Sequence, residues 1–232
     1  MTSRIFIHVV TMLLLAVSFV SCTKVPEMMH CDCKGEFYYR NHEGKKIYLD
    51  HLNDWLIIGF VRQAKAEEIV DYVNKTGLFK PVNITNVYYP DSAIWLSEHY
   101  YTLLIVNTKQ QKTCSQLEDI ILMLEQSSIV EYAGNIFCGE TNCSTWWATG
   151  FCFYVTVNDE NDLDDLYALS QETNTLIIGQ NEFDLRSFVL KANKYSTGNS
   201  LQMANFYFET GLFESTGPGL LFSKGSITGL GF

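Results

Sequence analysis

The chain has 232 residues, enough for one large domain or two small ones, and its formal net charge is −10. With 47% hydrophobic and 18% charged residues, it has the composition of a folded protein rather than a disordered one. The acidic balance and the lack of clustered Lys and Arg argue against a nucleic-acid partner, because phosphate binding depends on such clusters.

Residues 1–22 have the anatomy of a secretory signal: Arg4, an apolar run as far as Val20, and then Ser21 and Cys22. The ending FVSC resembles a bacterial lipobox, in which the cysteine carries the lipid and becomes the new N-terminus. We therefore expect an exported protein that is lipid-anchored through Cys22 to a bacterial membrane, the outer membrane of a Gram-negative cell. Each buried CH₂ of an acyl chain contributes about 0.8 kcal/mol, so several chains hold the protein there. The alternative is an ordinary signal cleaved near Ser21.

Six of the seven cysteines remain after Cys22, and an even number in an exported chain permits three disulfide bonds. Three of them cluster and are the candidate disulfide cysteines: Cys138, Cys143 and Cys152. The rival interpretation is a zinc site, but neither CDC nor CGETNC has the Cys-x₂-Cys spacing of structural zinc sites. We expect disulfides or buried thiols, with no metal and no other cofactor.

Strand-like and helix-like segments alternate after an N-terminal tether and hairpin over residues 23–52, which turns at NHEGK. Strand-like runs precede the helices at 54–61, 100–107, 151–158 and 186–193. Helices are expected at 64–76, 114–127, 160–173 and 199–210. The second helix can be capped by Thr113 or Ser115, and the fourth by Asn199 or Ser200.

The sequence TGLF occurs at both 76–79 and 210–213 and marks a repeated helix-turn-strand unit. Each of the four copies has an apolar helix stripe: Ala66, Ile69, Val70 and Val73; Leu117, Ile120, Ile121 and Leu124; Leu163, Leu166 and Tyr167; Met203, Ala204 and Tyr207. The residue after the helix is Gly77, Asn174 or Gly211 in three copies, and these types favour a left-handed conformation.

Paired, the four units predict an α+β protein with two tandem ferredoxin-like (βαββαβ) domains, in which helices cover one face of an antiparallel sheet. The first domain is expected at 53–138 and the second at 151–222, joined by a connecting loop or hairpin at 139–150. The glycine-rich end from Ser215 onward has no helix period, so we expect it to be mostly irregular, with 223–232 as a tail.

The chain carries no nucleophile elbow, phosphate-binding glycine loop or HExxH motif, so we predict that it is not an enzyme and has no catalytic residues. The histidines after the signal fall in predicted loops, tether or strand edges, where solvated side chains are expected: His30, His42, His51 and His99. The acidic run DENDLDD lacks the glycine and terminal glutamate of a calcium loop and fits a helix N-terminus better.

Aromatic residues occur in adjacent pairs that could form a recognition surface: Tyr38-Tyr39, Tyr88-Tyr89, Tyr100-Tyr101 and Trp146-Trp147. Alternate residues of a strand point to opposite faces, so half of each pair is expected in the core.

The segment from FYVTVNDEND to NFYFETGLFEST resembles the N-terminal pro-region of bacterial subtilisin-like (S8) serine proteases, especially those of lipoprotein type. The likeness covers most of 35–216 and is most specific in FVL and GNSLQMANFYFETGLFE. The resemblance implies a ferredoxin-like fold and a role as folding template and inhibitor. It also implies that the strand leaving the last helix, here Leu212 to Phe222, enters the protease active-site cleft.

The partner-binding residues that the resemblance implies are Leu212, Phe213, Glu214, Gly217, Pro218, Gly219 and Leu220. The chain departs from the family pattern in two ways: no catalytic-triad motif is present, and STGPGLLFSKG replaces Ala-Glu-Pro-like residues after TGLFE. We therefore expect a non-catalytic protein that binds, inhibits or chaperones a subtilisin-like protease. The alternatives are a cell-surface binding module for a glycan or host protein, and a truncated remnant of a protease gene.

Overall fold

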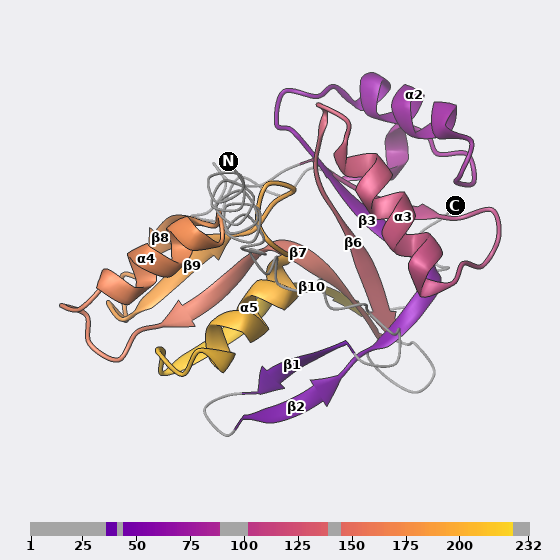
Figure 1. Cartoon of the computed structure of the whole chain (residues 1–232). Coiled ribbons are helices and arrows are strands. Elements are labelled where there is room, and N and C mark those ends of the chain that lie inside the picture. The colour runs from indigo at the N-terminus through magenta and orange to yellow at the C-terminus, as the bar shows by residue number, and fades with distance from the viewer. Residues whose placement is uncertain (1–35, 41–43, 89–101, 139–144, 225–232) are drawn as a thin grey trace, which may run out of the picture. The chain divides into compact units, whose positions relative to one another are not determined.

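The structure is a computed structural model that describes residues 36–40, 44–88, 102–138 and 145–224 (Figure 1). The described helices are α2 (Ala66–Thr76), the short 3₁₀ helix η2 (Ile84–Asn86), α3 (Cys114–Glu125), α4 (Asp164–Glu172) and α5 (Ser200–Glu209). The described strands are β1 (Phe37–Arg40), β2 (Lys45–Tyr48), β3 (Asp50–Phe60), β4 (Val87–Tyr88), β5 (Thr102–Asn107), β6 (Val130–Cys138), β7 (Thr145–Thr156), β8 (Leu176–Gln180), β9 (Ser187–Lys191) and β10 (Ser215–Lys224).

Strands β3 to β10 form one eight-stranded sheet in which every described pairing is antiparallel. Its order is β4-β5-β3-β6-β7-β9-β8, and β10 pairs with β7 beside this path. We call β3 to β6 with α2 and α3 the first half, and β7 to β10 with α4 and α5 the second half. The α+β class, the four α-helices of the described residues and the antiparallel sheet are therefore confirmed.

The helix ends follow the predicted local chemistry. The backbone is left-handed at Gly77, Asn174 and Gly211, with φ of 68°, 53° and 71°. Asn174 is the one described non-glycine residue with a positive φ, as expected for the second-best residue in this conformation. The side chains of Thr113 and Asn199 cap α3 and α5, each reciprocated by a glutamine three residues later.

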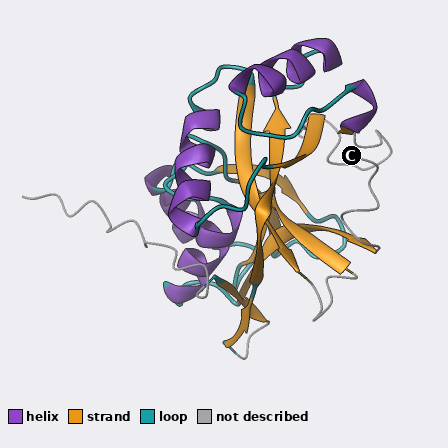
Figure 2. Ribbon diagram, turned by 90° about the vertical axis from the view of Figure 1, so that its right-hand side faces the viewer, coloured by secondary structure: helices purple, strands orange, loops and turns teal. Residues whose placement is uncertain are grey.

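The apolar helix stripes face the sheet in both halves. In the first half the buried residues of α2 and α3 form one cluster with alternate residues of β3 and β5: Leu56, Ile58, Phe60, Leu104 and Val106. In the second half Leu166 and Leu169 of α4, with Met203 and Tyr207 of α5, pack on Phe153, Val155, Phe188 and Leu190. Figure 2 shows helices along the left side of the strands.

One stripe prediction is wrong. Tyr167 is exposed, and Leu169 occupies the buried position on α4 instead. The helix begins at Asp164 rather than near 160, so its short buried face is defined by Leu166 and Leu169.

The sheet face without helices is also buried where the two halves meet. A second cluster joins residues of both halves: Trp55, Ile57, Leu103, Tyr132, Ile136, Trp146, Ala148, Phe151, Cys152 and Val189. These positions alternate along β3 with those that face the helices, as the two-residue period of a strand requires. A wide open sheet face is therefore not present at these positions.

Polar contacts join the halves as well. The Lys191 ammonium of β9 lies 2.9 Å from the Glu131 carboxylate of β6, and the two side chains are only 14% and 16% exposed. The Lys194 ammonium donates to the carbonyls of Ser127 and Val130 at 2.8 and 2.7 Å. All described residues belong to one compact unit of the chain, residues 31–232.

Strands β1 and β2 form the predicted hairpin, with Gly44 in a left-handed conformation beside the turn. Figure 1 shows the hairpin next to α5. The Asn205 amide donates to the Phe37 carbonyl at 2.7 Å, and the Tyr39 ring stacks on Phe208 at 4.2 Å. The N-terminal hairpin is thus fixed to the last helix of the second half.

Several sequence predictions fall outside the described residues. The signal segment and the lipidation site Cys22 are among them, as are Cys143, His30, His42, His99, Tyr89, Tyr100, Tyr101 and residues 225–232. No helix in the described part of the chain is long and apolar enough to cross a membrane. Strand β7 begins at Thr145, inside the segment 139–150 predicted as connecting loop or hairpin, and it pairs with β6.

Candidate functional site

The predicted partner-binding residues lie on the chain that leaves α5. Gly211 ends the helix in a left-handed turn, and Leu212 follows with 40% of its side chain exposed. Phe213 turns inward and stacks on the Tyr207 ring at 5.5 Å, so it is part of the core rather than an available contact. Glu214 forms an ion pair with Arg186, and its amide donates to the Thr156 carbonyl at 2.9 Å.

The helix before this segment is held rigidly. The Tyr207 hydroxyl lies 3.1 Å from the Thr173 hydroxyl and 2.9 Å from that of Thr175, which connects α5 to the end of α4. Burial is the main reason why the pKa of Tyr207 is raised, so the phenol stays protonated. The Thr216 hydroxyl donates to the Ala204 carbonyl at 2.6 Å, which attaches β10 to α5. The candidate strand therefore rests on a fixed support.

The remaining predicted residues are in β10: Gly217, Pro218, Gly219 and Leu220. The expectation of a mostly irregular end is wrong for 215–224, because β10 pairs with β7 from Ser215 to Lys224. The register shifts between Pro218 and Leu220, where Gly219 faces the β7 segment 150–152. An added Cβ at Gly219 would meet the Cys152 carbonyl oxygen at 2.5 Å, so the close approach of the strands requires glycine there.

The two edges of β10 differ. The Ala192 amide donates to the Phe151 carbonyl, and the Val157 amide donates to the Arg186 carbonyl. The backbone N–H and C=O groups of the odd-numbered residues of β7 therefore point toward β9. By the alternation of antiparallel pairs, the backbone groups of Tyr154 and Thr156 then point toward β10, where their register partners are Gly217 and Ser215.

Thr216 and Pro218 consequently direct their backbone groups away from β7, toward the outer edge of β10. Among the described strands, β10 is hydrogen-bonded to β7 alone, and β1, which contacts β10, pairs with β2 instead. By this alternation the outer edge carries an N–H and a C=O at Thr216, a buried residue next to α5, and a C=O at the partly exposed Pro218. Proline lacks the donor, as is common on strand edges.

The cysteines differ from the prediction in one respect. Cys138 is disulfide-bonded, and so is Cys114. Cys152 is free and buried, so its assignment as a disulfide cysteine is wrong. Its side chain packs in the cluster between the halves, and burial raises the pKa of the thiol to about 12. A thiol that stays protonated among apolar side chains is structural rather than reactive.

The expectation of solvated histidines is wrong for His51. Its side chain is buried, its Nε2 lies 2.9 Å from a Glu36 carboxylate oxygen, and its ring packs edge-on against Phe137. The cause is the hairpin, which brings Glu36 back over β3; this could not be seen from local sequence.

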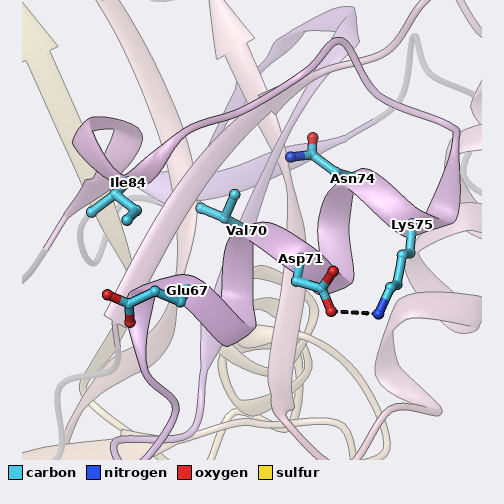
Figure 3. Close-up of a pocket in the computed structure, with 6 residues that line it drawn as sticks. All are labelled: Glu67, Val70, Asp71, Asn74, Lys75 and Ile84. Atoms are coloured by element: carbon cyan, nitrogen blue, oxygen red, sulfur yellow. Dashed lines mark hydrogen bonds and ion pairs between the residues drawn. The ribbon is translucent and has the colours of Figure 1, made fainter.

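A shallow pocket on the outer side of α2 was not indicated by the sequence (Figure 3). It is lined by Glu67, Val70, Asp71, Asn74, Lys75 and Ile84. Its polar groups are engaged structurally: Lys75 pairs with Asp71 one turn away, and the Asn74 amide exchanges two hydrogen bonds with the Val82 backbone.

The acidic run divides between a turn and a helix start. Asp164 and Asp165 lie in the first turn of α4, as predicted, where the helix dipole favours them. Asp159 instead accepts two hydrogen bonds from Asn161, which lower the pKa of its carboxyl group. Within the described ranges, no group of three or more His, Cys, Asp or Glu residues could hold a metal ion.

The described aromatic pairs contribute to packing. Tyr38 lies against Trp147 at 6.2 Å, while Trp146 is buried in the cluster between the halves. The Tyr39 hydroxyl donates to Glu209 at 2.7 Å; burial and this carboxylate raise the pKa of Tyr39 to about 12. These four aromatic residues do not gather into one exposed surface.

Comparison with other proteins adds no assignment: no family model matches the chain, and a search of curated proteins found no match.

Proposed function

We propose that this chain is a non-catalytic, exported lipoprotein that binds a subtilisin-like serine protease in trans, as an inhibitor or folding chaperone. The docking element is β10 with the residues that lead into it. The single observation that carries the proposal is that β10 follows the last helix and, among the described strands, is paired on one edge only. Such an edge can accept an extended segment of another protein by β-augmentation.

The proposal includes a fold of two tandem ferredoxin-like units. Each half runs strand, helix, strand, strand, helix, strand. Their strand orders, β4-β5-β3-β6 and β10-β7-β9-β8, place the first and third strands of each unit in the middle. These orders support the kinship with subtilase pro-regions that the sequence resemblance suggests.

A surface binding module for glycans or host proteins is the alternative, and the structure disfavours it. That function would use an open sheet face with projecting aromatic residues, but Trp55, Tyr132 and Trp146 are buried between the halves. A protease-gene remnant remains a separate hypothesis, which a protease reading frame directly downstream in the genome would favour.

The test compares two variants of Thr216 in inhibition assays against purified subtilisin-like proteases. Thr216→Pro removes the outward N–H and the bond from the Thr216 hydroxyl to Ala204, whereas Thr216→Val removes only the hydroxyl bond. Deleting 212–232 would be a poor test, because it would also remove Phe213 from the core and β10 from the sheet.

We expect Thr216→Val to inhibit like the wild type and Thr216→Pro to be at least about tenfold weaker, which corresponds to about 1.4 kcal/mol. Equal inhibition by the two variants would exclude docking through this edge. If the wild-type chain inhibits or refolds none of the proteases, the function itself is wrong.

A further inference from the structure

Three loops meet at one end of the second half, and we call them together the three-loop surface. They are residues 157–163 after β7, 181–186 between β8 and β9, and 211–214 before β10. The Val157 backbone amide donates to the Arg186 carbonyl at 2.9 Å, and the Asn158 side-chain amide donates to the Leu212 carbonyl at 2.8 Å. With the Arg186–Glu214 ion pair, these bonds join all three loops.

Apolar side chains project from this surface. Phe183 is 97% exposed, Leu185 is 49% exposed and Leu212 is 40% exposed. Exposed apolar groups that lie together mark interaction sites more often than single ones do. Phe183 is the most exposed of the large hydrophobic side chains in the described part of the chain.

The turn that carries Phe183 is held in place by hydrogen bonds. The Phe183 backbone amide donates to the Asn181 side-chain oxygen at 2.9 Å, and the Gln180 side-chain amide donates to the Leu185 carbonyl at 2.6 Å. Asp184 accepts from the Ser187 hydroxyl at 2.7 Å. Because the turn is fixed, binding would order few additional groups, which favours affinity.

The same surface is strongly acidic. Its single basic residue is Arg186. It carries six carboxylates: Asp159, Glu160, Asp162, Glu182, Asp184 and Glu214. Hydrogen bonds from Asn161 to Asp159, and from Ser187 and the Arg186 amide to Asp184, lower the pKa of both carboxyl groups. The negative charge therefore persists into mildly acidic solution. A partner must supply the opposite charge.

We infer that the three-loop surface is a second contact with the protease, where Phe183 enters an apolar pocket rimmed by lysine or arginine side chains. This inference rests on the proposed function, since it takes the partner to be the same. Leu212 and Glu214 lead directly into β10, so a protein paired with that strand also reaches this surface. Aromatic residues that fill pockets are the usual anchors of protein interfaces, and surrounding charges steer the encounter.

The experiment measures binding of the full chain to a purified subtilisin-like protease whose catalytic serine is replaced by alanine. Phe183→Ala removes the anchor, and Leu122→Ala is the matched control, an exposed apolar side chain on α3 of the first half. We expect the dissociation constant to rise at least tenfold for Phe183→Ala and to change less than twofold for Leu122→Ala. We expect Glu182→Lys to slow association several-fold at low salt and to have less effect at high salt.

The outcomes separate the two proposals. If Thr216→Pro weakens binding but Phe183→Ala and Glu182→Lys do not, the second contact is excluded and the docking strand is retained. If Phe183→Ala weakens binding and Thr216→Pro does not, the three-loop contact is supported and the edge is not used. No binding by the wild-type chain overturns both. Because Phe183 is exposed, its replacement leaves the fold intact, which circular dichroism can verify.

Discussion

The two halves of the molecule share an element order, but their last strands have different environments. Strand β6 of the first half lies between β3 and β7, whereas β10 of the second half is hydrogen-bonded to β7 on one side and to no described strand on the other. The edge of β10 is therefore the main difference between the last strands of the two halves. The outer edge of β6 is covered because it pairs with β7 of the second half.

The exposed surfaces of the two halves also differ. The β8–β9 turn of the second half presents Phe183 and Leu185 among carboxylates. In the first half a shallow pocket lies on α2, and its Lys75 and Asp71 pair with each other.

The largest effect on stability is expected where β7 and β10 approach each other closely at Gly219. Gly219→Ala would place a Cβ 2.5 Å from the Cys152 carbonyl oxygen, and backbone cannot move aside easily. We expect a loss of about 2–4 kcal/mol in the free energy of unfolding, measured with denaturant. The control is Gly217→Ala two residues away, where nothing lies within 4 Å and the change should stay within about 0.5 kcal/mol. Similar losses for the two variants would contradict the close approach of β7 and β10 at Gly219.

A smaller effect is expected from the ion pair that joins the halves. Lys191→Met leaves the mostly buried Glu131 carboxylate without its 2.9 Å partner, and we expect a cost of about 1–3 kcal/mol. Lys75→Met breaks an exposed pair within the first half, at a cost below about 0.5 kcal/mol. Thermal unfolding of both variants checks the difference. Equal costs would mean that the junction between the halves is solvated.

The buried thiol at the junction gives stability a dependence on alkaline pH. The pKa of Cys152 is about 12 in the folded chain and 9.0 ordinarily, so the unfolded state loses this proton first as the pH rises. Between pH 9 and 11 the wild type should lose about 1 kcal/mol per pH unit more than Cys152→Ala does. Denaturant titrations at several pH values test this; parallel curves for the two proteins would refute it.

The smallest effects are expected at the helix starts, where the halves are alike. Thr113→Ala in α3 and Asn199→Ala in α5 should each cost about 1 kcal/mol, because each removes a side-chain cap. Lys65→Ala before α2 should cost little, since that side chain makes no cap bond. The midpoints of denaturant unfolding, compared at an unchanged denaturant dependence, give these costs. A large loss of stability for Lys65→Ala would contradict the expected difference between capped and uncapped helices.

Local signals explain what the sequence could predict. The 3.6-residue periods located all four α-helices of the described residues, and the preference of Gly and Asn for a left-handed backbone identified Gly77, Asn174 and Gly211. The same short-range chemistry offered two candidate caps for each of two helices, and Thr113 and Asn199 are the ones that cap α3 and α5.

Long-range pairing explains what the sequence could not. The glycines and proline of β10 are poor strand formers, and the strand exists because β7 lies beside it. His51 is buried because the hairpin that precedes β3 folds back and brings Glu36 next to it. The burial of Cys152 depends on the contact between the halves, and Phe183 had no signal until its exposure was known.

The most direct test of the central claim, that the outer edge of β10 is unpaired until a protease binds, is hydrogen exchange at single amides. In the free chain we predict slow exchange for the Gly217 amide, which by the alternation of the pairing points toward β7, and faster exchange for the Thr216 amide, which belongs to a buried residue but has no described strand hydrogen-bonded on its side of β10. Addition of an inactivated subtilisin-like protease should make the Thr216 amide slow as well. A Thr216 amide that is already protected in the free chain, or that remains fast in a saturated complex, would contradict the account.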